Sequence, residues 1–98
     1  MTRSSGNVFA DLGFPPAEAQ NLLLRTTLMI AIEKFIADND LSQRAAAARL
    51  GVTAPRLNDL LRGKIEKFSL DALVTMLARV GLRVELKVSR APARRKAA

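Results

Sequence analysis

The sequence predicts a mainly α-helical domain that ends in one β-strand. Apolar residues recur at helical spacing in several stretches, each bounded by residues that cap or break helices. Near the C-terminus, residues 82–88 instead alternate between apolar and charged side chains, which is the period of a half-buried strand. The chain has 98 residues, which is enough for one small domain.

The charge of the chain is unevenly distributed. The net charge is +7, yet residues 1–41 carry three basic and five acidic side chains. Residues 42–67 carry six basic side chains against two acidic ones, and residues 89–98 carry four basic ones. A basic region of this kind suits nucleic acid, although ordinary solvated charge would look the same. We expect residues 1–6 to be disordered, 7–88 to form the domain and 89–98 to be a basic, disordered tail.

The composition argues against an enzyme. The chain has no His and no Cys, which removes the commonest general base and the commonest metal ligands. It also has no paired-carboxylate motif and no glycine-rich phosphate loop, so we expect no cofactor and no metal. The N-terminus does not resemble a signal peptide, and no apolar run is long enough to span a bilayer. The expected location is therefore the cytoplasm, without a membrane partner.

The first third of the domain predicts a short packing segment followed by a long helix. Residues 7–14 hold Val8, Phe9, Leu12 and Phe14, and such side chains pack on the domain or on a second chain. Two prolines then favour a helix start, because proline is tolerated in the first turn. Residues 17–37 follow as one helix whose apolar arc is wider than one face requires. This helix is therefore deeply buried, or it meets a partner.

Residues 41–64 predict two short helices joined by a tight turn. Ser42 caps the first helix, and Gly51 permits the positive φ of the turn. Thr53 caps the second helix, with Pro55 in its first turn, and Gly63 ends it. Isolated helices below ~12–15 residues are marginal in water, so this unit needs the rest of the chain as a scaffold.

The spacing of these two helices matches a helix-turn-helix, in which the second helix enters the DNA major groove. Arg56 suits guanine and Asn58 suits adenine, while Asp59 must accept from cytosine or pair with Arg56 or Arg62. Side chains at helix starts and the following lysines suit phosphates. A small helical bundle with solvated arginines is the alternative. The predicted DNA-binding residues are Ser42, Gln43, Arg44, Thr53, Ala54, Pro55, Arg56, Asn58, Arg62, Lys64 and Lys67.

The end of the domain predicts one more helix and the strand. Ser69 caps a helix over residues 70–80, and Gly81 closes it. A strand over residues 82–88 needs a partner for its backbone groups. That partner is either a short piece near Val8 and Phe9 or the same strand of a second chain. The predicted dimer interface consists of Leu82, Val84, Leu86 and Val88.

The residues SQRAAAARLGVTAPRLNDLLRGK, followed by FSLDALVTML, resemble the Cro/repressor-type (XRE) helix-turn-helix family. NVFADLGF, the long helix with Glu18 and Leu22, LRGKIEKFSLDALVTMLARVG and the final RVEL strand resemble the HigA-type antitoxins and their stand-alone relatives. The resemblance covers about residues 7–88. It implies a five-helix-type bundle that acts as a homodimeric autorepressor on a palindromic double-stranded DNA operator and neutralises a RelE-like ribonuclease toxin.

One departure from the family pattern concerns Ala54 and Pro55, which stand where many Cro/repressor proteins have polar base readers. The expected readout therefore shifts to Arg56 and Asn58, or to apolar contact with a thymine methyl group. Two other functions remain open. One is a protein-interaction module that mainly wraps a partner protein, and the other is a stand-alone, phage-like repressor without a toxin.

Overall fold

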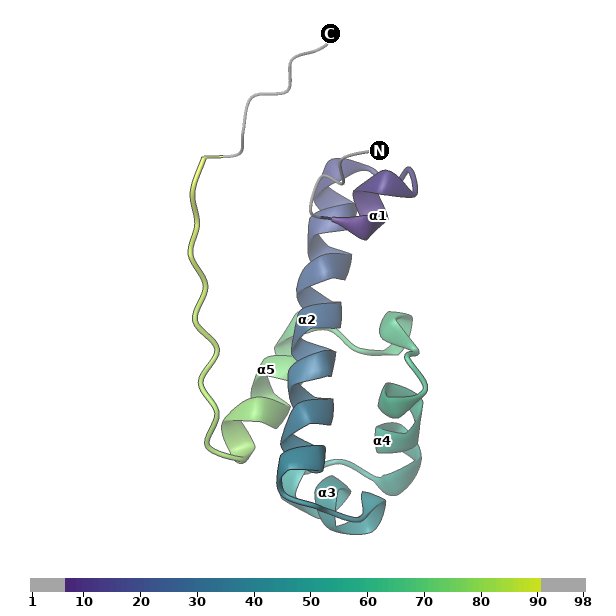
Figure 1. Ribbon diagram of the computed structural model, residues 1–98, viewed down its shortest axis with the longest axis vertical. Coiled ribbons are helices and arrows are strands. Elements are labelled where there is room, and N and C mark those ends of the chain that lie inside the picture. The colour runs from purple at the N-terminus through teal and green to yellow at the C-terminus, as the bar shows by residue number, and fades with distance from the viewer. Residues whose placement is uncertain (1–6, 91–98) are drawn as a thin grey trace, which may run out of the picture.

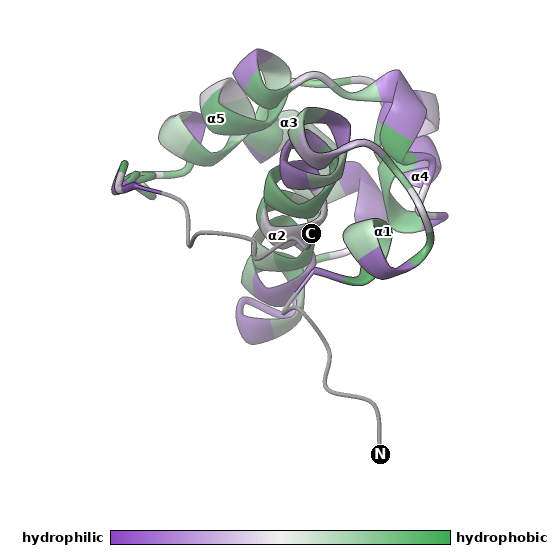
Figure 2. Cartoon of the chain, turned by 90° about the horizontal axis from the view of Figure 1, so that it is seen from above, coloured by the Kyte–Doolittle hydropathy of each residue, from purple (hydrophilic) through white to green (hydrophobic). Residues whose placement is uncertain are grey.

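The long helix α2 is the axis of the domain. The computed structural model describes residues 7–90 and shows helices arranged around the lower half of α2, with α1 against its beginning (Figure 1). Seen from above in Figure 2, α5 and α4 lie on opposite sides of α2, with α1 on the same side as α4. The elements are α1 (Val8–Asp11), α2 (Pro16–Asp38), α3 (Gln43–Leu50), α4 (Ala54–Leu61), the 3-10 helix η1 (Ile65–Lys67) and α5 (Leu70–Arg79).

The prediction of a mainly helical domain is confirmed, and the helix limits lie close to the predicted ones. Helix α2 exceeds the predicted 17–37 by one residue at each end, with proline in its first turn. Its wide apolar arc is needed because α1, α4, η1 and α5 all lie against it. No helix in the described part of the chain is long and apolar enough to cross a membrane.

The core lies between the second half of α2 and the helices α3, α4 and α5. Leu50, Leu57, Leu60 and Leu73 are completely buried there, and truncating one such leucine to alanine costs about 2–5 kcal/mol. This core holds the helix-turn-helix unit in place, which the two short helices could not achieve alone. Its members are Met29, Ile32, Ala46, Ala47, Leu50, Leu57, Leu60, Phe68, Leu73, Met76 and Leu77.

Helix α1 packs on α2. Asn7 caps α1 by accepting a hydrogen bond from the backbone N–H of Phe9 at 2.9 Å, and its own Nδ2 donates to the carbonyl of Ala19 at 3.1 Å. The Phe9 and Phe14 rings meet edge to face, with centroids 6.0 Å apart. Because Val8 and Phe9 are helical, one of the two predicted alternatives, in which residues near them pair as a strand with residues 82–88, is wrong.

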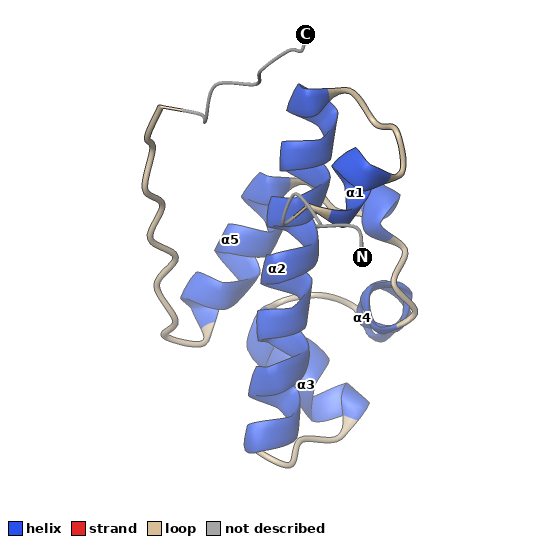
Figure 3. Cartoon of the chain, turned by 45° about the horizontal axis from the view of Figure 1, so that its top comes forward, coloured by secondary structure: helices blue, strands red, loops and turns tan. Residues whose placement is uncertain are grey.

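The segment after α5 is extended but unpaired. We call residues 82–90 the C-terminal segment. It runs beside α2 and α5 without a helix (Figure 1), and Figure 3 shows no strand among residues 7–90. The predicted β-strand is thus not confirmed, because within one described chain the segment has no neighbouring strand with which to pair. The predicted disorder of residues 1–6, and of most of the tail, concerns residues outside the described range.

Candidate nucleic-acid interface

Two side-chain caps define the helix-turn-helix unit formed by α3 and α4. The hydroxyl of Ser42 accepts a hydrogen bond from the backbone N–H of Ala45 at 3.1 Å. The hydroxyl of Thr53 accepts one from the backbone N–H of Arg56 at 3.2 Å. Each cap satisfies a donor that the first turn of a helix leaves unpaired. Both predicted caps are confirmed, so the beginnings of α3 and α4 are set by local sequence.

The turn between α3 and α4 requires the backbone freedom of Gly51, and the side chain of Arg79 lies close above it. The φ of Gly51 is +78°, in the left-handed region, and a Cβ at this position would lie 2.1 Å from Nε of Arg79. Arg79 belongs to the last turn of α5, so its side chain lies directly over the turn. The sequence predicts the backbone requirement, whereas the contact with Arg79 is visible only in the structure.

Helix α4 buries one face and exposes the other. Leu57 and Leu60 are completely buried, and the small, buried Ala46 and Ala47 of α3 allow the two helices to approach closely. The opposite face carries Pro55, Asn58 and, just after the helix, Arg62, which are exposed. Of the predicted contact residues, Ser42, Gln43, Arg44, Thr53, Ala54, Pro55, Asn58, Arg62 and Lys67 are exposed, while Arg56 and Lys64 are partly buried.

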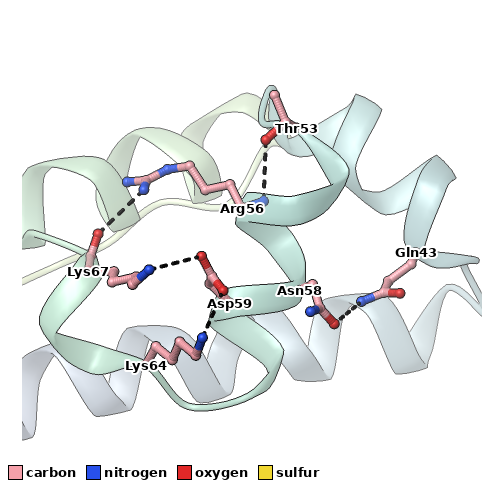
Figure 4. Close-up of polar contacts among 7 residues, drawn as sticks. All are labelled: Gln43, Thr53, Arg56, Asn58, Asp59, Lys64 and Lys67. Atoms are coloured by element: carbon pink, nitrogen blue, oxygen red, sulfur yellow. Dashed lines mark hydrogen bonds and ion pairs between the residues drawn. The ribbon is translucent and has the colours of Figure 1, made fainter.

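Arg56 lies against the domain. Its guanidinium carbon is 4.4 Å from the centroid of the buried Phe68 ring, and its Nη1 donates to the carbonyl of Lys67 at 3.4 Å. Figure 4 shows the side chain directed toward the segment after α4. The guanidinium that the sequence assigns to guanine is therefore engaged in fixing α4 to η1.

Asp59 pairs with two lysines. Its carboxylate lies 3.4 Å from Nζ of Lys64 and 3.6 Å from Nζ of Lys67 (Figure 4). The predicted alternatives within the chain, Arg56 and Arg62, are wrong, because the chain bends after α4 and brings the two lysines back over the last turns of the helix. Partial burial would raise the pKa of Asp59, but the two ammonium groups hold it below its usual range.

Gln43 and Asn58 link the start of α3 to the exposed face of α4. Nε2 of Gln43 donates to Oδ1 of Asn58 at 3.3 Å (Figure 4). Both side chains are exposed, so the pair lies on the surface. Because an amide oxygen has two lone pairs, Asn58 retains one acceptor site and both N–H donors for another molecule. The sequence predicts both residues as contacts but not their link.

Arg25 of α2 is a residue that sequence reasoning missed. Its Nη1 donates to the carbonyls of Ile65 and Phe68, at 3.1 and 3.4 Å. Its Nε is buried and has no hydrogen-bond partner among the described residues. The available signal was a single arginine within an apolar stripe of the long helix. Arg25 holds η1 from one side while Arg56 and Asp59 hold it from the other.

The candidate interface is therefore a mainly cationic surface whose lysine segment is linked to α2 and α4 by hydrogen bonds and ion pairs. Arg44 of α3 and Arg62 at the end of α4 are exposed, and Lys64 and Lys67 follow α4 and pair with Asp59. Among the described residues, no group of His, Cys, Asp and Glu has the composition of a metal site. Such a surface can hold a phosphate backbone and present amide groups to a polar groove.

Comparisons with known proteins agree with this geometry. A family described as helix-turn-helix domain matches residues 8–89. A solved structure described as an XRE family transcriptional regulator is 36% identical, with a TM-score of 0.71, over 83% of this chain and 91% of the other. A comparison with curated proteins found no significant match. The match over almost the entire described domain, together with the capped α3–turn–α4 unit, places this chain in the XRE family of helix-turn-helix proteins.

Proposed function

We propose that the protein is a sequence-specific DNA-binding transcriptional regulator that represses its own operator. The proposal rests on the exposed face of α4. This helix is capped by Thr53, and basic side chains lie near its exposed face. A recognition helix contacts bases through residues near its N-terminus, and this end of α4 is unobstructed in the described chain.

The exposed residues divide into two groups by chemistry. Asn58, oriented by Gln43, suits a bidentate contact with adenine, and Ala54 and Pro55 suit a thymine methyl group. Ser42, Arg44 and Thr53 lie at helix starts, where N–H groups and cations hold phosphates. Arg62, Lys64 and Lys67 suit further phosphates at the other end of α4. In this scheme Arg56 positions the surface and does not read a base.

The regulator acts as a homodimer on a palindrome. The exposed apolar residues of the C-terminal segment, Leu82, Leu86 and Val88, support this, since a second chain would cover them. Val84 belongs to the same apolar face and packs against the core cluster. Two copies related by a two-fold axis would place their recognition helices on half-sites about one helical turn apart.

A titration against the DNA upstream of the gene tests the DNA-binding function. Fluorescence anisotropy at several salt concentrations should show log K falling with log salt by ~0.9 per phosphate neutralised. Asn58→Ala should weaken binding about 10-fold and relax preference at one base pair, since a bidentate contact is worth ~1–3 kcal/mol. Asn21→Ala, an exposed asparagine on α2, is the matched control. A flat salt response with no sequence preference contradicts the proposal.

A second function, that of an antitoxin, is supported by the other end of the molecule. Helix α1 and the start of α2 extend away from α3 and α4 (Figure 1), and there Val8 is 55% and Leu12 70% exposed. Exposed apolar side chains of this kind suit a protein partner, for which the HigA resemblance implies a RelE-like toxin. Co-expression with the adjacent small open reading frame should give a complex that Leu12→Asp weakens. A neighbour that never forms one would favour the stand-alone repressor.

A further inference from the structure

The C-terminal segment has a complete unpartnered backbone edge. In the described chain, the N–H of Leu82 donates to the carbonyl of Leu77 at 3.0 Å, but no later N–H up to residue 90 donates to another backbone carbonyl. An extended edge with unpaired N–H and C=O groups is a template for another strand. The segment is therefore able to pair with a strand that lies outside the described part of this chain.

The two faces of the segment differ in character. Val84 is partly buried against the core, whereas Leu86 is 69% and Val88 94% exposed. Between the segment and the helices α2 and α5 lies a mostly apolar groove of about 200 Å³. Its walls include Leu24, Leu28, Leu70 and Val74 of the helices, together with Val84, Glu85 and Leu86 of the segment itself. The other face carries Arg83, Glu85 and Lys87, and Arg83 forms an ion pair with Glu85.

The charge order on this outer face fits a second copy of the same segment. Directly opposite residues of a strand pair share a face, and like charges there are destabilising. A parallel two-fold pair would place Arg83 opposite Arg83, and Glu85 opposite Glu85. An antiparallel pair centred on Glu85 would again place the two carboxylates together and Arg83 opposite Lys87. A register shifted by one residue would place apolar side chains opposite charged ones.

Two antiparallel registers remain, centred on Val84 or on Leu86, and both give opposite charges across the pair. The exposed fraction of the apolar side chains distinguishes the two registers. This fraction rises from Val84 to Leu86 to Val88, so the favoured register is the one that covers Val88. Centring on Val84 leaves Val88 facing the end of α5, where Gly81 has a left-handed φ and cannot continue a strand. Centring on Leu86 places each Val88 opposite the partner's Val84, at the edge of the partner's core.

We infer that a second copy of this chain pairs with residues 82–90 in antiparallel orientation, with Leu86 on the two-fold axis. Glu85 then faces the partner's Lys87, and Leu86 and Val88 become covered. This inference deepens the homodimer of the proposed function, on which it rests, but it makes no assumption about DNA sequence.

Cysteine cross-linking tests the register, and the chain is suited to it because it contains no cysteine. Directly opposite Cα atoms in an antiparallel pair are ~4.5–5.5 Å apart, within the range of a disulfide. After mild oxidation, Leu86→Cys should give a covalent dimer on a non-reducing gel, whereas Glu85→Cys and Val84→Cys should remain largely monomeric. Preferential cross-linking of either control variant overturns the register.

A charge exchange provides an independent readout. Glu85→Lys alone should raise the dimer dissociation constant about 10-fold, because two symmetric attractions become repulsions. Adding Lys87→Glu should restore dimerisation, measured by sedimentation. If the double variant stays weakened, Glu85 faces another residue and the inference fails. A wild-type chain that is monomeric at micromolar concentration also overturns it, whereas the DNA titration of that monomer tests the regulator function separately.

Discussion

The guanidinium of Arg56 stacks on the ring of Phe68, with the carbon 4.4 Å from the ring centroid. Phe68 is a core residue, and Arg56 lies on α4, the second helix of the helix-turn-helix unit. A cation over an aromatic ring contributes ~0.5–1 kcal/mol at exposed sites and ~2 when desolvated. The same arginine also bonds the carbonyl of Lys67. The contact thus joins α4 and the following lysines into one unit.

Replacing Arg56 by methionine should lower the free energy of unfolding by about 1 kcal/mol, because the cation–π contact and one hydrogen bond are lost. DNA binding should weaken to a similar extent on every sequence, since the residue positions the surface. Lysine should not restore either property, because it lacks the planar group that stacks. Thermal denaturation and binding to a series of operator base substitutions provide the measurements. Loss of preference confined to one guanine would instead identify Arg56 as a base reader.

Replacing Asp59 by asparagine should strengthen DNA binding several-fold at low salt. The carboxylate would repel phosphate and now occupies the ammonium groups of Lys64 and Lys67, both of which the variant releases. The gain should be larger for non-specific than for operator DNA, so the specificity ratio should fall. Anisotropy titrations with both duplexes measure the two affinities and their ratio, with Asp38→Asn on α2 as the control. Weaker binding to both duplexes would mean that Asp59 is needed to position the lysines.

The lowered pKa of Asp59 predicts the direction of an acid effect. Since the folded pKa lies below the unfolded value of about 3.8, the ion pairs add stability that is fully present above the unfolded pKa. That stability is lost as the pH falls through the folded pKa. The difference in stability between the wild-type protein and Asp59→Asn should therefore shrink between about pH 5 and pH 2, as measured by urea denaturation. A constant difference would contradict this linkage.

Gly63 provides a matched control for substitutions at Gly51, because the two glycines have nearly the same backbone φ angle. Their φ angles are +78° at Gly51 and +79° at Gly63, but only a Cβ on Gly51 meets another residue, Arg79, whereas nothing lies within 4 Å at Gly63. Alanine at either position should cost ~1–2 kcal/mol for the left-handed backbone. Gly51→Ala should cost more, because the arginine must move. Combining each change with Arg79→Ala should remove only the excess at Gly51, and equal costs at both positions would show that Arg79 moves freely.

Replacing Arg25 by methionine should destabilise the domain by about 1–3 kcal/mol, because the carbonyls of Ile65 and Phe68 lose a charged donor. The loop that carries Lys64 and Lys67 should also become more mobile, so DNA affinity should fall without a change in preferred sequence. Hydrogen exchange of residues 64–68 checks the loop directly. Arg49→Met, which removes a more exposed cation 5.2 Å from Phe35, is the matched control.

The sequence by itself determined helices α2 to α5 and the approximate positions of their ends, but not the short helices α1 and η1. Ser42, Thr53 and Ser69 each cap a helix as predicted, because a cap depends only on residues two or three positions away. Apolar spacing likewise identified most of the core, including Leu57 and Leu60. The family resemblance rests on the same local pattern, and its XRE assignment is confirmed by the comparisons.

Only the tertiary structure decided what the charged side chains contact. Arg25 reaches carbonyls 40 and 43 positions away, and Arg56 reaches one 11 positions away, which no local pattern encodes. The contacts of a long, flexible side chain depend on which groups the fold brings within its reach. Asp59 therefore pairs with Lys64 and Lys67 instead of the predicted arginines. Residues 82–88 illustrate the same division. Alternation specifies which face of an extended segment is apolar, but pairing needs a neighbouring strand, and within the described chain none is supplied.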